Sequence, residues 1–380
     1  MSFKTLLVTK SFPPVVGGTA YLLYELTRHF KTEELCVVHG INDPPIESDQ
    51  ILPFKRKQVL FFGSGINTLR LNRYFPKLYM VLIRLEIRKA IRRENPDCLY
   101  IHYPNGAFSS AAYLEAKRAK LPYVFYQDIL WEERESGAEL DLAREYEAAV
   151  IQDAKTCVAI TEFAAEHQSK KHGKEFITIP HTLDADEVPT SIDERMNDVP
   201  VIHFAGGIYP QMNQDSVERL IEAVKKTGRK VEFEFCSPDV PASLANEPIN
   251  WKYLSKSDLL NAQRSADILF LPQAFSSKSG QMITHNFPTK TMEYLCSGTP
   301  ILVHSPSNSY LSDLCRNEGF GVLVEEPDVD QLASAIIKLL DSEELRRTSV
   351  ERAIALAHKR DSRHWYKVLH KLLSDAVTGN

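Results

Sequence analysis

The chain has 380 residues, of which 43% are hydrophobic and 25% are charged, and its formal net charge is −5. This composition is typical of a globular protein with two domains, and it excludes both a disordered chain and a nucleic-acid binder that works by overall positive charge. The six cysteines are scattered without C-x-x-C spacing, which favours reduced, buried thiols over disulfides or a zinc site.

The first half of the chain alternates short apolar runs with amphipathic segments. A strand at Leu6–Thr9 leads into a glycine loop at Val15–Thr19 and then a helix at Ala20–Phe30, where leucines recur at helical spacing. Further strands are expected at Leu35–Val38, Cys98–His102, Tyr123–Tyr126, Cys157–Ile160 and Phe176–Ile179. This alternation predicts a parallel sheet with right-handed crossovers. The acidic stretch Asp184–Pro200 contains prolines and no periodicity, and we interpret it as a linker.

The second half repeats the same plan. Strands are expected at Val201–Phe204, Val231–Cys236, Ile268–Leu271, Ile301–His304 and Gly321–Val324, and helices at Ser216–Thr227, Asp328–Asp341 and Arg346–Ala376. The predicted fold class is α/β, with two Rossmann-like, doubly wound domains facing a cleft that holds the ligand. The domains are expected at residues 1–185 and 200–355, with a C-terminal helix at 356–380 packing back on the first domain.

The most informative segment runs from His285 to Pro300. Pro288 suits the first turn of a short helix, and Gly298 suits the position just past its end. Lys290 and Glu293 are three residues apart, so both project from one face of that helix. A cation and a carboxylate at the carboxyl edge of a parallel sheet suit a nucleoside diphosphate and its ribose, while a solvated surface pair is the alternative.

Several motifs together resemble the retaining GT-B glycosyltransferases of family 4, also called group 1. They are Ser11–Pro14 followed by Gly17-Gly18, Ile179–Asp184, Phe204–Gly207, Phe287-Pro288-x-Lys290-x-x-Glu293-Tyr294 and Gly298-x-Pro300. Each motif alone is weak, because a glycine turn after a strand is common. Together, in this order and spacing, the motifs are more specific, and the resemblance covers nearly the whole chain.

The resemblance implies a nucleoside-diphosphate sugar bound mainly by the second domain and an acceptor bound mainly by the first. Glu293 would accept hydrogen bonds from the two ribose hydroxyls, as an ionised acceptor. Lys290 and Lys278 would lie near the phosphates. The resemblance leaves the base, sugar, acceptor and linkage open, with UDP among the candidate nucleotides.

The resemblance also assigns roles to four glycines near the phosphates. Backbone N–H groups of Gly206 and Gly207 would complete the diphosphate site. Gly17 and Gly18 would let the first loop approach the leaving phosphate, where a Cβ would obstruct it. Phe287 belongs to the segment that binds the nucleotide sugar in the family.

The chain also departs from the family pattern. His285 stands where the first of two glutamates is usual, and we expect it to meet the donor sugar. Ile208–Asn213 contains no cation, although many members have two there. Gln127 replaces a histidine of the first domain. His102 and Asp128 are candidate acceptor or catalytic residues, with a structural histidine and a solvated acidic loop as the alternatives.

The resemblance also implies a mechanism. Transfer would proceed with retention, without a metal or other cofactor. The acceptor proton could pass to the leaving phosphate itself. Two other functions stay open: a nucleotide-sugar epimerase on the same fold, and a non-catalytic subunit that only binds nucleotide or a partner.

A basic region adds an independent indication about partners. Ile51–Asn95 holds eleven lysines and arginines against two glutamates, with aromatic residues interleaved. This pattern suits an anionic membrane surface and a lipid-linked acceptor, or else a solvated helix face with a loop. No RNA-binding motif accompanies it, so we expect no nucleic-acid partner. With no signal-peptide core and no apolar run of membrane-spanning length, we expect a cytoplasmic protein, or one held peripherally at the inner face of a membrane.

Overall fold

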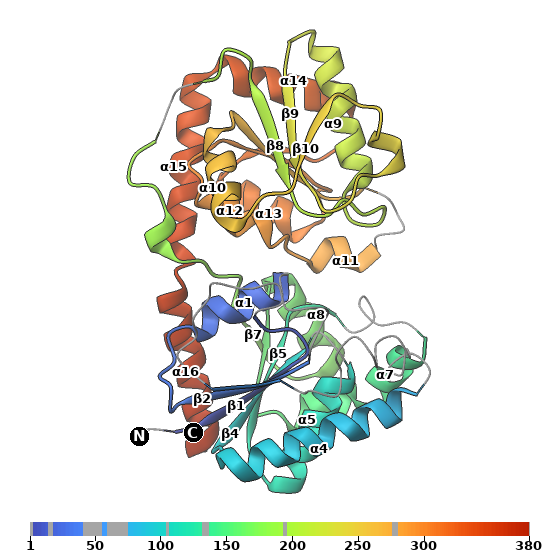
Figure 1. The fold of residues 1–380 in the computed structure, drawn as a ribbon, viewed down its shortest axis with the longest axis vertical. Coiled ribbons are helices and arrows are strands. Elements are labelled where there is room, and N and C mark those ends of the chain that lie inside the picture. Colours follow the sequence, from blue (N-terminus) through green and yellow to red (C-terminus); the bar gives the residue numbers. More distant parts are fainter. Residues whose placement is uncertain are drawn as a thin grey trace. The chain divides into compact units, whose positions relative to one another are not determined.

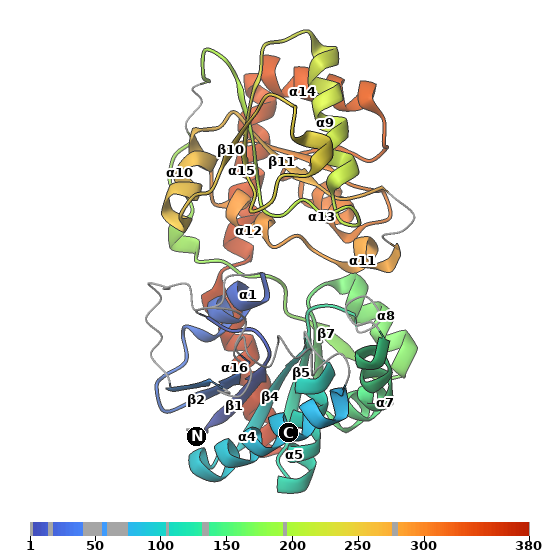
Figure 2. The ribbon, with the colours of Figure 1, turned by 45° about the vertical axis from the view of Figure 1, so that its right-hand side comes forward.

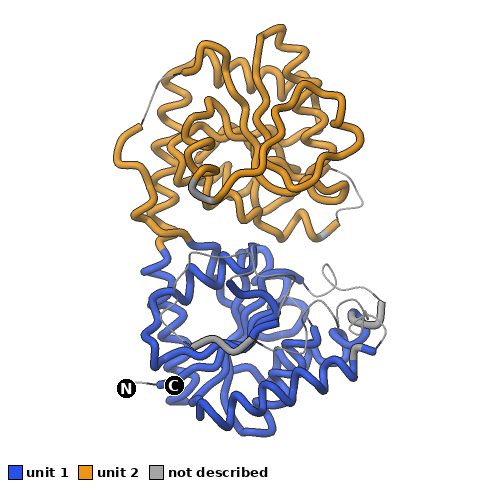
Figure 3. The backbone as a smooth tube through the Cα atoms, viewed as in Figure 1, with its two compact units in different colours: residues 1–182, 362–380 blue, residues 183–361 orange. Residues whose placement is uncertain are grey.

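The computed structural model describes residues 3–13, 18–40, 55–58, 75–103, 106–130, 137–192, 196–275 and 280–379. The chain forms two compact units, shown in Figure 3. Unit 1 comprises residues 1–182 and 362–380, and unit 2 comprises residues 183–361. Each unit is built on one parallel sheet with helices on both faces (Figure 1).

Unit 1 carries a seven-stranded sheet and the helices that cover it. Its strands are β1 (Thr5–Thr9), β2 (Leu35–His39), β3 (Lys55–Gln58), β4 (Cys98–Tyr103), β5 (Tyr123–Gln127), β6 (Thr156–Ala159) and β7 (Phe176–Thr178). Its helices are α1 (Gly18–Thr27), α4 (Pro76–Glu94), α5 (Gly106–Ala119), α7 (Gly137–Asp153), α8 (Glu162–His172) and α16 (Ser362–Thr378).

The strand order of unit 1 is β3-β2-β1-β4-β5-β6-β7, so the connection reverses direction between β1 and β4. Successive strand residues point to opposite faces. Leu6 and Val8 of β1 pack in the cluster that α4, α5 and α7 cover, whereas Leu7 packs in the cluster that α1 and α16 cover (Figures 1 and 2). Both faces of the sheet are therefore buried, as in a doubly wound fold.

Unit 2 has the same plan with six strands. They are β8 (Val201–Ala205), β9 (Glu232–Cys236), β10 (Ile249–Lys252), β11 (Ile268–Pro272), β12 (Ile301–His304) and β13 (Val322–Val324). The helices are α9 (Gln214–Thr227), α10 (Lys256–Ser265), α11 (Gly280–His285), α12 (Lys290–Leu295), α13 (Tyr310–Glu318), α14 (Val329–Asp341) and α15 (Glu343–Lys359), with short 3-10 turns at Ala185–Glu187 and Ala242–Leu244.

The strand order of unit 2 is β10-β9-β8-β11-β12-β13, which places the reversal between β8 and β11. Ligands of such sheets bind outside the carboxyl ends of the strands at this point. The turn after β8 and the loop after β11 therefore frame the expected ligand position within unit 2.

The structure adds two strands that the sequence pattern does not indicate. Lys55–Gln58 forms β3 and Ile249–Lys252 forms β10, each at the edge of its sheet. Both strands have four residues, and β3 is made only of basic and amide side chains, so neither shows an apolar run. Backbone pairing with β2 and β9 orders them instead.

The segment predicted to be helical from Arg346 to Ala376 is helical with one interruption. It is two helices, α15 and α16, separated at Arg360 and Asp361. The Arg360 carbonyl accepts a hydrogen bond from the backbone N–H of Leu183, and its guanidinium donates to the Tyr310 hydroxyl at 3.2 Å. These distant partners explain the break, because no proline or glycine marks it in the sequence.

All six cysteines are buried and free, as predicted. Burial raises the pKa of Cys98 to about 11 and the pKa of Cys157 and Cys315 to about 12, so these thiols stay protonated at neutral pH. Among the helices of the described ranges, none combines the length and the apolar character needed to cross a bilayer.

Candidate functional site

The glycine turn after β8 is the centre of the candidate site. Gly206 has a φ of +109°, which L side chains rarely adopt, and its N–H donates to the Cys236 carbonyl at 2.8 Å. A Cβ on Gly207 would lie 2.4 Å from the ring and hydroxyl of Tyr209. The backbone conformation therefore favours glycine at position 206, whereas a side chain at position 207 would displace the Tyr209 ring.

Asn213 closes the turn from the start of α9. Its Oδ1 accepts from the backbone N–H of Tyr209 at 2.9 Å, and its Nδ2 donates to the Gly207 carbonyl at 3.1 Å. The Tyr209 ring lies over Gly207 and is 53% exposed. The turn that lacks cations thus offers a phenol instead, which the sequence pattern did not single out.

Lys290 lies beside the same turn. Its Nζ is 3.8 Å from the centroid of the Phe204 ring and 3.1 Å from the position of a Cβ on Gly206. The Nζ atom is buried and has no hydrogen-bond partner among the described residues. Burial lowers the pKa of Lys290 to about 7, although the nearby Glu293 carboxylate opposes this shift.

Tyr294 fixes the helix that carries Lys290. Its buried hydroxyl accepts a hydrogen bond from the N–H of Ala205, the last residue of β8, at 3.0 Å. Because Lys290 is four residues earlier on α12, it lies on the same face of this short helix. The helix ends before Gly298, which has a φ of +77°. The predicted short helix is thus confirmed, although it begins two residues after Pro288.

The other predicted residues of this segment occupy different environments. Glu293 is half-buried on α12, one turn after Lys290. His285 is the last residue of α11 and is also half-buried. Phe287 is 3% exposed and packs edge-to-face against Tyr310 at 5.7 Å, which is a packing contact. A contact between Phe287 and a ligand remains a prediction.

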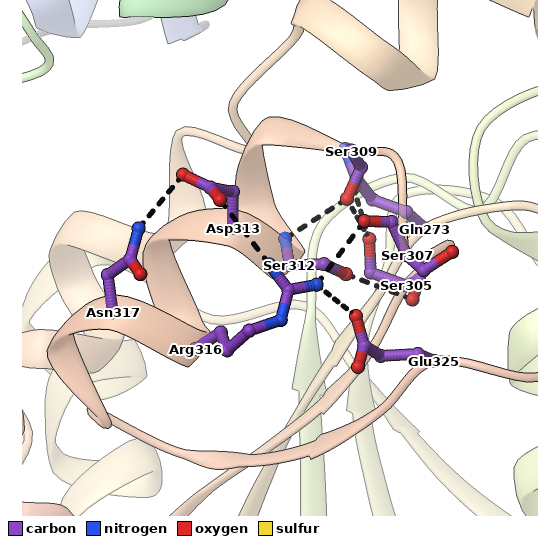
Figure 4. Close-up of polar contacts among 9 residues, drawn as sticks. All are labelled: Gln273, Ser305, Ser307, Ser309, Ser312, Asp313, Arg316, Asn317 and Glu325. Atoms are coloured by element: carbon purple, nitrogen blue, oxygen red, sulfur yellow. Dashed lines mark hydrogen bonds and ion pairs between the residues drawn. The ribbon is translucent and has the colours of Figure 1, made fainter.

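A polar network ties the carboxyl ends of β11 and β12 together (Figure 4). The Ser305 hydroxyl donates to Gln273 Oε1 at 2.6 Å and lies 2.6 Å from the Ser309 hydroxyl. Ser309 caps α13 by accepting from the N–H of Ser312. Gln273 Nε2 reaches the Asn286 carbonyl at 3.5 Å. The loop that precedes α12 is therefore linked to both strand ends.

His304, the last residue of β12, is hydrogen-bonded to Arg219 of α9. Its Nδ1 lies 3.1 Å from the Val324 carbonyl, so this nitrogen carries the proton. Its Nε2 then accepts from Arg219 Nη1 at 3.1 Å. Burial lowers the pKa of His304 to about 4, which keeps it neutral. His304 thus holds Arg219 over the Phe275 ring, 5.3 Å from its centroid.

In unit 1, His102 and Asp128 lie at the carboxyl ends of the paired strands β4 and β5, and His102 also contacts the end of β1. His102 Nδ1 is 3.3 Å from the Thr9 hydroxyl, and its Nε2 is 3.9 Å from Asp128 Oδ2. Asp128 also accepts from the Thr19 hydroxyl at 2.8 Å. Burial, followed by the nearby His181, lowers the pKa of His102 to about 3. The pair therefore joins a neutral imidazole to a buried carboxyl group.

The remaining predicted positions are less informative. Gln127 is buried and accepts from Gln168 Nε2 at 2.9 Å, so it packs within unit 1. Gly18 is the first residue of α1. Gly17 and Lys278 lie outside the described residues.

Family comparisons agree with this arrangement. Residues 16–187 match the family model described as Glycosyltransferase Family 4, and residues 243–355 match the model described as Glycosyl transferases group 1. The chain belongs to the group 1, family 4 glycosyltransferases. Among curated proteins, no sequence matches this glycosyltransferase.

Solved structures with similar folds cover both units. Sucrose-phosphate synthase from Thermosynechococcus elongatus has a TM-score of 0.74 at 12% identity, covering 99% of this chain and 100% of its own. Anabaena HepE in complex with UDP-glucose has a TM-score of 0.70 at 12% identity, covering 98% and 99%. A trehalose-phosphate synthase (UDP-forming) from Burkholderia xenovorans has a TM-score of 0.68 at 11% identity, covering 98% and 100%. The predicted GT-B fold class is confirmed.

The sequence pattern missed three contributors to this glycosyltransferase's site. Tyr209 and Asn213 shape the glycine turn, and Tyr294 anchors α12 to β8. The position of Tyr294 directly after Glu293 in the motif was a sequence signal that could have identified this residue. Nothing in the local sequence indicates that the Tyr209 ring covers Gly207. Among the described residues, His, Cys, Asp and Glu side chains form no group that could hold a metal ion.

Proposed function

We propose that this glycosyltransferase transfers a sugar from a UDP-sugar, bound in unit 2, to a glycan or lipid-linked saccharide recognised by unit 1. A uridine donor is chosen because HepE was solved with UDP-glucose and the Burkholderia synthase is described as UDP-forming. The strand order favours unit 2 as the donor site, since the glycine turn and Lys290 lie at its reversal point.

The buried amino group of Lys290 is the observation that carries this proposal. An ammonium group buried without an acceptor is unfavourable, because its lost hydration is not replaced. A diphosphate beside Gly206 would supply acceptor oxygens and negative charge to the same atom. The cation that the turn itself lacks would then come from α12.

The other residues of unit 2 have complementary roles in the proposal. Glu293 accepts from the ribose hydroxyls one turn further along α12. Backbone N–H groups of the turn donate to the phosphates. His285, at the end of α11, recognises the donor sugar in place of the usual glutamate.

The proposed reaction is retaining and independent of metal. The bond between the sugar C1 and the diphosphate oxygen breaks, and an acceptor hydroxyl bonds to C1 on the same face. The acceptor proton passes to a departing phosphate oxygen, so no protein base is consumed. Lys290 stabilises the negative charge that develops on the leaving group. In unit 1, His102 and Asp128 bind and orient the acceptor hydroxyl.

Calorimetric titrations with UDP and with uridine test the donor site. Lys290→Met should weaken UDP binding by about ten- to a hundredfold, as expected for a charged hydrogen-bond partner, and leave uridine binding unchanged. Glu293→Ala should weaken both ligands, because both carry the ribose. Lys230→Met and Glu344→Ala, exposed residues of unit 2, are matched controls.

Different results point to different functions. Equal UDP affinity in wild type and Lys290→Met would remove the diphosphate assignment. UDP binding with no sugar transfer from UDP-glucose to saccharide acceptors would favour the non-catalytic subunit. Conversion of the donor sugar without acceptor would identify an epimerase. Retention is read from the anomeric configuration of the product by NMR.

A further inference from the structure

Large apolar side chains are exposed mainly on one helix of unit 1. Seven large hydrophobic residues of the described chain are exposed, and four lie on or next to α4. These are Phe75, Leu78, Val81 and Leu85, which are 62%, 52%, 44% and 43% exposed. The other three, Tyr209, Val240 and Tyr253, all belong to unit 2. Such a concentration is unusual for a surface without a binding partner.

The four residues share one face of α4. Their spacings of three, three and four residues follow the helical repeat. The opposite face packs into the core of unit 1 through Tyr79, Met80, Ile83, Ile87 and Ala90. The first half of α4 is therefore apolar on both sides, whereas a solvated surface helix is polar on the outside. We call the side that carries the four exposed residues the outer face of α4.

The second half of the outer face is basic. Lys89 and Arg92 continue the helical repeat after Leu85, and both are exposed. The helix has six basic and two acidic residues, although the whole chain has a net charge of −5. Within the described part of the chain, Lys89 pairs with Glu86 at 2.7 Å, whereas Arg92 makes no ion pair. Apolar and cationic groups thus lie end to end on one face.

The edge of this helix is also cationic. Arg84 and Arg88 of α4 and Arg118 of α5 all donate to Glu115, which is fully buried. One carboxylate cannot neutralise three guanidinium groups, so positive charge remains beside the outer face. α4 and α5 pack side by side on the same face of the unit 1 sheet (Figure 1).

We propose that the outer face of α4 docks onto an anionic lipid bilayer. The helix would lie in the plane of the surface, with its four apolar side chains between the lipid headgroups and its cations near the phosphates. An anionic bilayer matches both halves of the face, since it offers apolar depth and a negative surface. A protein groove would need both an apolar cleft and a matching acidic rim.

Vesicle co-sedimentation with the full chain tests this surface. Wild type should bind vesicles of phosphatidylcholine and phosphatidylglycerol at least about tenfold more tightly than pure phosphatidylcholine, and added salt should weaken binding. Leu78→Ser combined with Leu85→Ser should reduce binding about tenfold. Lys89→Glu combined with Arg92→Glu should abolish the preference for the anionic lipid. Tyr253→Ser, at an 83% exposed site in unit 2, is the control.

Each variant is first checked for an unchanged thermal unfolding midpoint. Absence of binding to anionic vesicles by wild type would overturn the proposal. Binding by both double variants that equals wild-type binding would overturn it too. A self-association in solution that Leu78→Ser with Leu85→Ser abolishes, without vesicle binding, would assign the face to a second copy instead. The assay needs no nucleotide, so its outcome is separate from that of the donor site.

Discussion

At the scale of single residues, Lys290 is the most consequential side chain of this glycosyltransferase. Its buried Nζ lies over the Phe204 ring, where the ring face stabilises a cation. Burial nevertheless disfavours the charge, so the amine titrates near neutral pH. A phosphate ligand prefers the ammonium form, and binding should therefore raise the pKa of Lys290 and take up a proton.

We predict that UDP affinity falls as the pH rises above about 7. The unliganded amine loses its proton there, so binding above this pH must restore it, and affinity should drop by up to about tenfold per pH unit. Calorimetry between about pH 7.5 and 9 measures this slope, and titrations in buffers of different ionisation enthalpy count the protons taken up.

Lys290→Arg is the control for this prediction, because arginine stays charged over this range. Glu293 on α12 and His203 on β8 are the groups that interact electrostatically with Lys290. Burial lowers the pKa of His203 to about 4, so it is neutral throughout and does not add to the slope. The same slope in wild type and Lys290→Arg would assign the titration to another group.

At the scale of elements, one buried carboxylate joins α4 to α5. Glu115 of α5 accepts 2.9 Å hydrogen bonds from Arg84, Arg88 and Arg118. Burial alone would raise its pKa, but the three arginines outweigh burial and lower the pKa of Glu115 to about 2. The charged form is thus stabilised by folding, and α4 is held against α5 by more than apolar packing.

We predict that Glu115→Gln lowers the free energy of unfolding by about 3 kcal/mol at neutral pH, because the lowered pKa of the buried Glu115 carboxyl corresponds to about that much stabilisation of its charged form. The folded pKa lies below the ordinary value of 4.5, so the stabilisation is full above about pH 4.5 and is lost as the pH falls towards 2. Urea unfolding of wild type and variant should therefore differ at pH 7 and converge on acidification.

Glu86→Gln is the matched control on α4. Glu86 pairs with Lys89, and their side chains are 12% and 63% exposed; an ion pair whose cation is open to solvent contributes at most about 1 kcal/mol. A loss for Glu115→Gln no larger than that for Glu86→Gln would show that the arginine cluster adds little to stability. A difference between wild type and Glu115→Gln that is unchanged down to pH 3 would contradict the pKa argument.

At the scale of the whole molecule, the two units share the order of six strands, to which unit 1 adds β7, and they differ in what they place at the reversal point. Unit 2 has a glycine turn and a buried lysine there, which suits an anionic ligand. Unit 1 has a neutral histidine, a threonine and a buried carboxyl group, which suits hydroxyl groups. The same scaffold thus supports a division into donor and acceptor units.

We predict that UDP protects unit 2 selectively in hydrogen–deuterium exchange. Amides of the segments 204–209 and 287–294 should exchange more slowly with UDP, because they line the proposed diphosphate and ribose positions. Amides of β4 should be unaffected. Lys290→Met at the same UDP concentration is the control, and protection confined to β4 and β5 would move the donor to unit 1.

Much of the fold follows from the sequence because its signals are local. Apolar runs of four to six residues, such as those of β1, β4 and β12, predict buried strands, and glycines such as Gly298 predict helix ends. β3 and β10 are exceptions, since edge strands need only one paired side and carry no apolar pattern. The break at Arg360 is another, because its cause lies at Leu183 and Tyr310.

The sequence by itself determined the family, the doubly wound class and the pairing of Lys290 with Glu293 on one helix face. These depend on residues within a few positions of one another, where helical and strand periodicity operate. Only the tertiary structure decided that Lys290 lies over Phe204 without a hydrogen-bond partner among the described residues, that Tyr209 covers Gly207, and that the basic helix α4 has an apolar outer face. Burial and partners depend on packing between distant segments, which no local pattern encodes.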